Sequence, residues 1–280
     1  MRRLFVVVVV VSSVLWAAAP AMGVWGGEDD GDRHPMVGAI YVDWDEDGTI
    51  VWGEQTCSGS YLGWSTNREA QVFLTAAHCL AGDAAAGFDT FWVSFDPEPM
   101  EGDGIPDGLI RATSFVWDPR YEAEWKWGGH PYDSGILLLP AGSVKGVAPV
   151  RLPTAGLLDD LQRTGDLRGS LLELVGYGTF PTWHEPGGPQ FSYDVVRRTA
   201  SAEVAGVRGP FLLFHQNTQA TDLGGVCYWD SGSPNLIPGT RIAVATAVGV
   251  VGWPCNALGW GYRLDTPAAR EFLGEYLTLP

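Results

Sequence analysis

Three residues far apart in the sequence have side chains that can together perform nucleophilic catalysis: His78, Asp133 and Ser231. A serine hydroxyl is a weak nucleophile unless a neighbouring base takes its proton. That base in turn needs a third group that fixes its tautomer and stabilises the imidazolium. The three residues can fill these roles if the fold brings them together, with backbone N–H groups around Ser231 facing the developing oxyanion.

Two of these roles have a competitor in the sequence. The tripeptide Asp-Ser-Gly occurs twice, but Ser134 precedes an apolar run typical of a buried strand, whereas Ser231 precedes Gly-Ser-Pro, which favours an exposed turn. We therefore assign the nucleophile to Ser231. His130 is the strongest rival base because it lies close to Asp133 in the sequence, yet its surroundings favour it less than those of His78.

The first 23 residues have the pattern of a secretory signal peptide. Arg2 and Arg3 precede an apolar stretch from 4 to 15, and small residues stand before Val24. An uncleaved membrane anchor is the alternative, because residues 4–22 could nearly span a bilayer. The small residues favour cleavage, so we predict a secreted, extracellular protein. A cut before Val24 has Ala21 and Gly23 at the −3 and −1 positions, and a cut after Ala21 also fits.

Export makes the cysteines interpretable as disulfide partners. An even number in an oxidising compartment predicts disulfides, and three pairings can be drawn among Cys57, Cys79, Cys227 and Cys255. The local pairing, 57–79 with 227–255, closes two short loops, each worth about 3 kcal/mol if unstrained. Zinc is the competing interpretation, which the absence of any Cys-x-x-Cys pair disfavours. We predict no catalytic or structural metal among them.

Short apolar runs separated by turn residues predict an all-β chain. Strands are expected at 37–42, 72–74, 91–95, 135–139, 171–175, 211–214 and 242–251. Helical periodicity is confined to the end, where Thr266 can cap a helix and Pro267 suits its first position. This length suits two barrels or one large sandwich, with a crossover within 140–160.

The segments around the three chemical residues resemble the chymotrypsin-like (trypsin-fold) serine peptidases. Thr-Ala-Ala-His-Cys at 75–79 matches the histidine motif of that family at every position. Trp-Asp-Ser-Gly-Ser-Pro at 229–234 matches its nucleophile motif, Gly-Asp-Ser-Gly-Gly-Pro, at four of six positions. The segments 57–62, 174–178 and 249–255 also resemble segments of that family. The order of His78, Asp133 and Ser231 along the chain is the order found in the family as well.

The resemblance covers about 24–280 and implies a fold and a domain division. It implies two antiparallel six-stranded β-barrels of the chymotrypsin type with a C-terminal α-helix. The first barrel, 24–150, would carry His78 and Asp133, and the second, 151–280, would carry Ser231. The resemblance also places Cys57 on the strand that carries the partner cysteine of the histidine loop.

The resemblance assigns roles to further residues. His78 would be the general base, Asp133 its orienting group and Ser231 the nucleophile, with the amides of Trp229 and Ser231 as the oxyanion hole. A free amine at Val24 would pair with the buried Asp230, so that secretion itself would activate the protein. The substrate pocket would be formed by Gly225, Val226, Gly252 and Gly259.

Trp229 and Ser233 depart from the family pattern at positions that are glycine there, and Ser233 is the milder change. Trp229 stands where the family has glycine, beside the oxyanion hole, and losing one oxyanion donor costs ~10²–10³ in rate. No carboxylate stands at the pocket-base position, Gly225, and Asp222 would need a register shift to serve there. We therefore expect an apolar residue before the cleaved bond, not Arg or Lys.

The charge balance limits the partners. With 17 Lys and Arg against 33 Asp and Glu, the net charge of −16 disfavours nucleic acid and anionic membranes. The loop 43–54 fits the calcium-loop pattern Asp-x-Asp-x-Asp-Gly-x5-Glu, but strands predicted at 37–42 and 49–52 favour a solvated hairpin over an EF-hand. A second acidic loop at 96–107 equally suits solvent, and calcium is the alternative at both.

These observations predict a secreted serine endopeptidase that acts on protein or peptide substrates. It would need no cofactor, bind no membrane after signal cleavage and be a monomer. Two alternatives use the same residues: a catalytically impaired homologue that serves as a secreted binding module, and a secreted esterase. An α/β-hydrolase is disfavoured, because Gly-x-Ser-x-Gly is absent around Ser231 and His78 precedes the serine.

Overall fold

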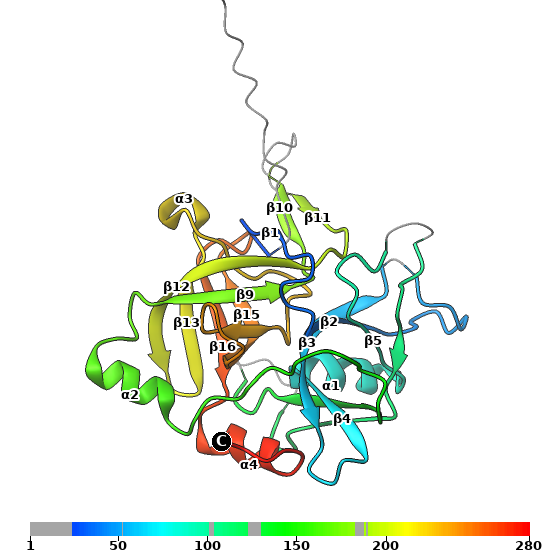
Figure 1. The fold of residues 1–280 in the computed structure, drawn as a ribbon. Coiled ribbons are helices and arrows are strands. Elements are labelled where there is room, and N and C mark those ends of the chain that lie inside the picture. The colour runs from blue at the N-terminus through cyan, green and yellow to red at the C-terminus, as the bar shows by residue number, and fades with distance from the viewer. Residues whose placement is uncertain (1–23, 52, 101–103, 123–129, 183–187, 189) are drawn as a thin grey trace, which may run out of the picture.

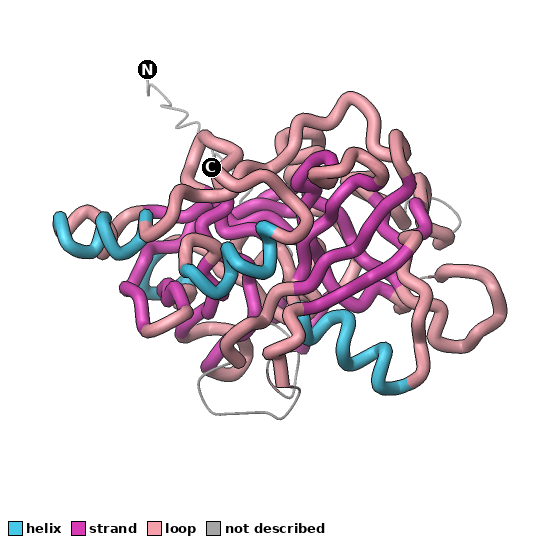
Figure 2. Tube along the Cα trace, turned by 90° about the horizontal axis from the view of Figure 1, so that it is seen from below, coloured by secondary structure: helices cyan, strands magenta, loops and turns pink. Residues whose placement is uncertain are grey.

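The computed structural model describes residues 24–51, 53–100, 104–122, 130–182, 188 and 190–280. The predicted signal peptide, 1–23, lies outside the described residues. Among the described residues, none of the helices combines the length and the apolar character needed to cross a bilayer. Strands occupy the centre of the molecule and helices lie at its periphery (Figure 2).

The first half of the chain forms an antiparallel sheet in the order β6-β5-β2-β3-β4-β8-β7. Its strands are β2 Val37–Tyr41, β3 Gln55–Trp64, β4 Ala70–Thr75, β5 Trp92–Ser94, β6 Ile110–Arg111, β7 Ser114–Trp117 and β8 Gly135–Pro140. The edge strands β6 and β7 are two pieces of one stretch of chain, interrupted at Ala112 and Thr113. Because this stretch bonds to β5 at one end and to β8 at the other, the sheet curls into a barrel-like shape.

The second half forms a closed ring of six antiparallel strands. They are β9 Leu171–Gly176, β12 Arg198–Arg208, β13 Phe211–His215, β14 Pro234–Leu236, β15 Ala243–Val251 and β16 Leu258–Arg263. Pairing of β12 with β9 closes the ring, and β1 Glu28–Asp29 is added on the free side of β12. A separate hairpin consists of β10 Phe180–Thr182 and β11 Gln190–Ser192. The two sheets lie side by side (Figure 1).

The predicted all-β architecture with two barrel-like sheets and a C-terminal helix is confirmed. The helix, α4 Pro267–Gly274, begins at Thr266, whose hydroxyl accepts a hydrogen bond from the backbone of Ala269 at 3.2 Å. Sequence analysis missed α1 Ala77–Ala86, α2 Leu157–Thr164 and α3 Thr218–Thr221. The predicted strand at 49–52 is wrong over its described part: 49–51 form no strand, and the loop after β2 runs on until β3.

Each end of the described chain packs on the opposite barrel. Val24 belongs to the apolar core of the second barrel, and β1 pairs with β12 there. In return, Phe272 and Leu273 of α4 pack into the core of the first barrel. The predicted domain boundary at residue 150 stays a prediction. Each end of the described chain packs with the half of the chain on the other side of that boundary.

The cysteines form the local pairing, Cys57–Cys79 and Cys227–Cys255, with Cα–Cα distances of 6.1 and 5.5 Å. No cysteine is free. Because each sulfur is bonded to one other sulfur, none is a thiolate that could bind zinc. The competing zinc interpretation of these cysteines is therefore excluded. The first bridge ties β3 to α1, and the second joins the segment before Ser231 to the turn after β15.

Candidate active site

His78 follows and Asp133 precedes one of two neighbouring strands of the first barrel, β4 and β8. Strand β4 leads into α1, whose first turn carries His78, and β8, which pairs with β4, begins just after Asp133. The Asp133 carboxylate accepts from the His78 backbone N–H at 3.0 Å and meets the ring Nδ1 at 2.9 Å. With the Nδ1 proton directed at Asp133, Nε2 is the nitrogen left to act as a base.

Opposing effects set the pKa of His78. Burial lowers it by disfavouring the imidazolium, but the charge of Asp133 and its hydrogen bond raise it by more, so the pKa of His78 lies above its ordinary value. Asp133 is only 3% exposed, so its negative charge is poorly screened by water. This pairing stabilises the protonated ring that general-base catalysis would create.

Ser231 lies in a tight turn of the second barrel that is held from both sides. Its carbonyl accepts from the backbone of Ser58 on β3, and Gly232 donates to Ala247 on β15, both at 2.8 Å. Gly232 has a left-handed φ of 87°, and a Cβ there would strike Thr75 Oγ1 and the Ser58 carbonyl. Only glycine fits at this position, which explains the Ser-Gly pair.

His78 and Ser231 line one cleft at the junction of the barrels. The cleft has a volume of about 470 Å³ and is also lined by the Cys57–Cys79 bridge, Asp83, Tyr228 and Trp229. Within the described part of the chain, no hydrogen bond joins Ser231 Oγ to His78 Nε2. Such contacts are often long without substrate and tighten when it binds.

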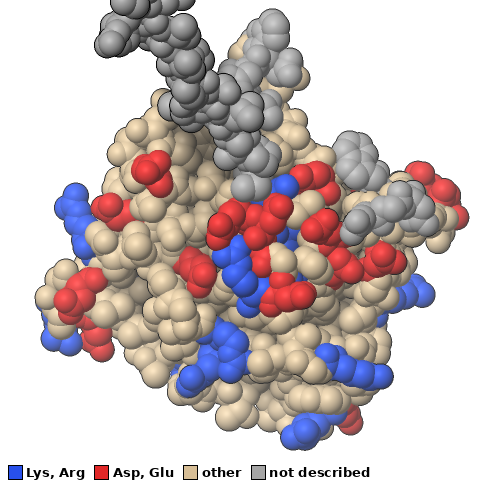
Figure 3. Space-filling model, turned by 45° about the horizontal axis from the view of Figure 1, so that its top comes forward, with Lys and Arg blue, Asp and Glu red and all other residues tan. Residues whose placement is uncertain are grey.

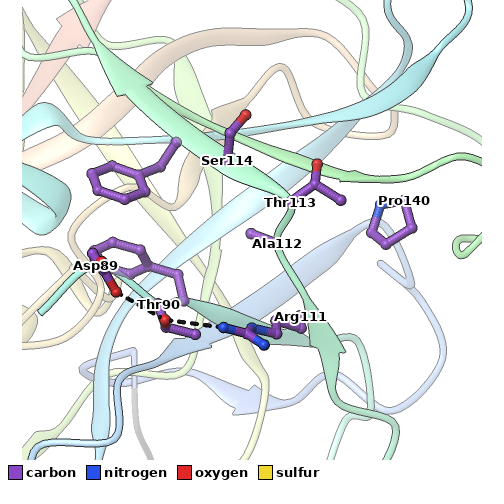
Figure 4. Close-up of a pocket in the computed structure, with 9 residues that line it drawn as sticks. Asp89, Thr90, Arg111, Ala112, Thr113, Ser114 and Pro140 are labelled. Atoms are coloured by element: carbon purple, nitrogen blue, oxygen red, sulfur yellow. Dashed lines mark hydrogen bonds between the residues drawn. The ribbon is translucent and has the colours of Figure 1, made fainter.

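A larger cavity, of about 690 Å³, lies elsewhere on the first barrel. Figure 4 shows Thr90, bonded to Asp89 and Arg111, on its wall. It holds none of the residues that the sequence selected for chemistry. The smaller cleft is therefore the candidate active site.

Trp229 is accommodated beside Ser231 in an unusual conformation. Its φ of 68° is left-handed, which costs an L-residue about 1–2 kcal/mol. Its ring packs on Tyr193 at a centroid distance of 4.8 Å, and Tyr193 donates from its hydroxyl to Gln55 Oε1 at 2.9 Å. Among the described residues, the N–H groups of Trp229 and Ser231 donate to no protein acceptor.

Asp230 is fully buried, and within the described part of the chain its side chain is bound only by backbone donors. Its carboxylate accepts from Gly178 and Cys227 at 2.8 and 2.9 Å. Burial raises the pKa of Asp230 to about 7, and no cation of the described chain forms an ion pair with it. The segment after Val24 pairs with the stretch of chain that precedes Asp230, where Gly225 donates to the Trp25 carbonyl at 2.8 Å.

The residues predicted to form a substrate pocket do not line this cleft. Gly225, Val226 and Gly259 are buried, Gly252 is exposed, and none of the four lines the cleft. Asp222 is exposed in a groove next to Gly26 and Gly224, so it does not serve as a pocket base. The side chain that stands in the predicted pocket is Gln216, which no signal in the sequence indicated.

The competing residues are placed outside the cleft. Ser134, the second serine of the repeated tripeptide, is fully buried at the start of β8. His130 is buried with its ring edge against Tyr121, at a centroid distance of 5.5 Å. Neither lines the cleft shared by His78 and Ser231.

The acidic loops differ in what the structure describes of them. In the first, the carboxylates of Asp43, Asp45 and Asp47 lie within 4.8 Å of one another. Glu54, the last position of the pattern, accepts from the backbones of Trp44 and Val51. The second loop is interrupted at 101–103, outside the described residues. Calcium therefore stays an untested alternative at both loops.

Acidic side chains gather near the middle of one face, beside a smaller number of basic ones (Figure 3). Much of the surrounding surface is uncharged. This distribution agrees with the acidic composition of the chain.

Comparison with known proteins identifies the fold but not the family. No family model matches the chain, and no curated protein matches it. Among solved structures, HL collagenase superposes with a TM-score of 0.62 at 13% identity, covering 89% of this chain and 96% of its own. A mutant of human heparin binding protein (CAP37) gives 0.62 at 17%, and human heparin binding protein itself gives 0.60 at 16%, each covering 89% of this chain and 94% of theirs.

Proposed function

We propose that this protein is a secreted serine endopeptidase that cleaves peptide bonds through an acyl-enzyme on Ser231. The observation that carries the proposal is the double hydrogen bond of Asp133 to His78 at a cleft that Ser231 also lines. The trypsin-like fold and its two disulfides support it, because disulfide-bonded domains are typical of extracellular proteins.

The proposed reaction has two steps. Ser231 Oγ attacks the peptide carbonyl while its proton passes to His78 Nε2, and the N–H groups of Trp229 and Ser231 bind the oxyanion. His78 then gives that proton to the leaving amine as the C–N bond breaks. Water attacks the resulting ester, again losing a proton to His78, and Ser231 recovers its hydroxyl as the acid departs. No cofactor is required.

For activation and specificity we propose what the sequence predicts. Removal of residues 1–23 would free the amine of Val24, which could then form an ion pair with Asp230. The absence of a carboxylate at Gly225, together with the remote position of Asp222, supports an apolar residue before the cleaved bond rather than Arg or Lys.

A fluorophosphonate probe tests the proposal directly. The intact mass of the secreted protein is measured before and after labelling, with Ser231→Ala as the control. We expect one adduct that the control lacks, on a chain that begins at Val24. A folded chain that begins at Val24 and takes no adduct would overturn the proposal.

A catalytically impaired binding module is the second candidate, and one specific observation favours it. The left-handed backbone of Trp229 beside Ser231 is held by the contact with Tyr193, and a bulky residue there can crowd the oxyanion side. An esterase is the third candidate. Parallel assays on peptides and on short acyl esters separate the three, because a peptidase cleaves both substrates, an esterase only the esters and a binding module neither.

A further inference from the structure

The predicted pocket walls enclose a side chain of the same protein. Gln216 follows β13 and is fully buried between the segment of Gly225 and the segment of Gly259. A Cβ built on Gly225 would lie 2.7 Å from Gln216 Oε1, and one built on Gly259 would lie 2.6 Å from that same atom. The space that the two glycines leave open is therefore occupied by the Gln216 amide.

Hydrogen bonds hold this amide against both walls. Nε2 donates to the carbonyls of Val226 and Cys255, at 3.0 and 2.6 Å, and Oε1 accepts from the Val226 backbone at 3.2 Å. The backbone of Gln216 is fixed as well, since it donates to Ala257 and accepts from the Trp25 indole, both at 3.2 Å. A side chain with these partners is not free to swing aside for a substrate, because its departure would leave buried backbone groups unpaired.

A second side chain closes the space from the barrel side. The buried ring of Phe214 faces Gly259, so closely that a Cβ on Gly259 would strike it. The open cleft, in contrast, extends from His78 and Ser231 toward the Cys57–Cys79 bridge and is lined by neither glycine. The cleft that His78 and Ser231 line therefore does not extend into the space between Gly225 and Gly259.

We propose that Gln216 is a specificity-determining residue that fills the substrate pocket and restricts the residue before the cleaved bond (P1) to glycine or alanine. The inference rests on the proposed function, which it deepens by naming a substrate class. A P1 residue without a long side chain needs no space between Gly225 and Gly259. Leucine or phenylalanine at P1 would have to displace the Gln216 amide.

A series of peptides that differ only at P1 tests the proposal, with Gly, Ala, Leu and Phe at that position. We expect kcat/KM for the Gly and Ala peptides to exceed that for Leu and Phe by at least tenfold. Gln216→Ala should raise cleavage of the Leu and Phe peptides and move this ratio at least tenfold toward them. A wild-type preference for Leu or Phe, or an unchanged ratio in the variant, would overturn the proposal.

Gln71→Ala is the matched control. Gln71 is also a buried glutamine, with Nε2 donating to Val144 O at 2.9 Å and Oε1 accepting from Val144 N at 2.8 Å, but it belongs to the first barrel. Its loss should leave the P1 ratio unchanged. A shift equal to that of Gln216→Ala would attribute the change to general loosening and count against a role in specificity.

A measurement independent of catalysis separates this inference from the proposed function. In the wild-type protein the Val226 amide should exchange slowly with deuterium, and Gln216→Ala should speed that exchange at least tenfold. Fast exchange of Val226 in the wild type would overturn the filled pocket whatever the activity. If the Val226 amide exchanges slowly but the probe does not label Ser231 and no peptide is cleaved, only the proposed function is overturned.

Discussion

The two barrels contribute to the candidate active site in different ways. In the first, Asp133 binds both the backbone and the ring of His78, and adjacent strands β4 and β8 hold the two residues in place. In the second, the turn of Ser231 combines a left-handed Trp229 with a buried carboxyl at Asp230 that no cation pairs with among the described residues. The base is thus supported by its own barrel, whereas the nucleophile turn depends on partners brought from elsewhere in the chain.

The difference has a physical origin. The His78 site is built from backbone pairing along the sheet, which forms whenever the barrel forms. The Ser231 turn relies on Ser58 from the other barrel, on Tyr193 from the segment after β11, and on the N-terminal segment that runs past Gly225. We call the His78–Asp133 pair the stronger half of the site and the Ser231 turn its weaker half. Changes elsewhere in the chain can therefore disturb the weaker half while the stronger half stays intact.

The largest effect is expected from breaking the stronger half. Asp133→Asn keeps the size of the side chain but removes its charge and favours the wrong tautomer of His78, so kcat/KM should fall about 10⁴-fold. In the unchanged protein kcat/KM should rise with pH through an apparent pKa above 6.5, because Asp133 raises the pKa of His78 and only the neutral ring is a base. Peptide-hydrolysis profiles from pH 5 to 9 measure both.

The control for this variant is an unchanged thermal midpoint, which separates lost chemistry from unfolding. A loss below tenfold would show that Asp133 does not orient the base.

The next effect sharpens the contrast at the weaker half. The folded-state pKa of Asp230, about 7, lies above its ordinary value of 3.8, so the folded state binds the proton more tightly than the unfolded state. Stability is therefore greatest at low pH and falls as the pH rises through about 7. We consider a Ser231→Ala variant in which the peptide bond between residues 23 and 24 is intact, so that Val24 has no free amine. Between pH 5 and 8, the Asp230 carboxyl should lower the free energy of unfolding of this variant by about 3 kcal/mol, at 1.36 kcal/mol per pKa unit.

Urea unfolding across that pH range measures the loss. The same protein starting at Val24 should lose less, because a charged amine next to Asp230 lowers its pKa, and Asp230→Asn should flatten the profile of the longer chain. Equal slopes in the two chains would contradict the proposed ion pair between Val24 and Asp230.

A smaller effect is expected from the backbone of residue 229. Trp229→Gly and Trp229→Ala both lose the contact with Tyr193, but only alanine keeps a Cβ at a φ of 68°. We expect the glycine variant to be the more stable of the two by about 1 kcal/mol in urea unfolding. An alanine variant of equal or greater stability would show that residue 229 is not left-handed in solution.

The smallest effect concerns the acidic loops. A solvated loop at Asp43, Asp45 and Asp47 should leave the thermal midpoint unchanged when calcium is replaced by a chelator. A calcium-dependent rise of several degrees, lost in Asp45→Asn, would instead identify a cation site that supports the first barrel.

The sequence was most informative where function demands particular residues at fixed spacing. The motif around His78 and the turn around Ser231 predicted the fold, and the local pairing of the cysteines is confirmed. Helix α1 could not be predicted, because its run of alanines and small residues has weak amphipathic periodicity. The strand expected at 49–52 failed because Glu54 binds the loop backbone at Trp44 and Val51, which holds the chain away from a tight hairpin.

The substrate pocket was beyond the reach of sequence patterns. Gly225 and Gly259 indicate space, since neither has a side chain, but a glycine does not reveal which side chain occupies the space it leaves. Gln216 reaches that space from a strand end that is close in the sequence to Gly225 and distant from Gly259. Only the register of β13 against β16, which pairs Phe214 with Gly259, brings the three together.

The exchange of chain ends between the barrels has a consequence for biosynthesis. While the ribosome is still making the second barrel, the core of the first barrel lacks Phe272 and Leu273. Strand β1 likewise has no partner until β12 has been made. Neither barrel can reach its final packing during translation, and most of the pairings that link them span more than a hundred residues. Chains with such long-range contacts fold slowly. Both barrels, and with them the cleft between His78 and Ser231, can therefore be completed only after the last residues of the chain have been made.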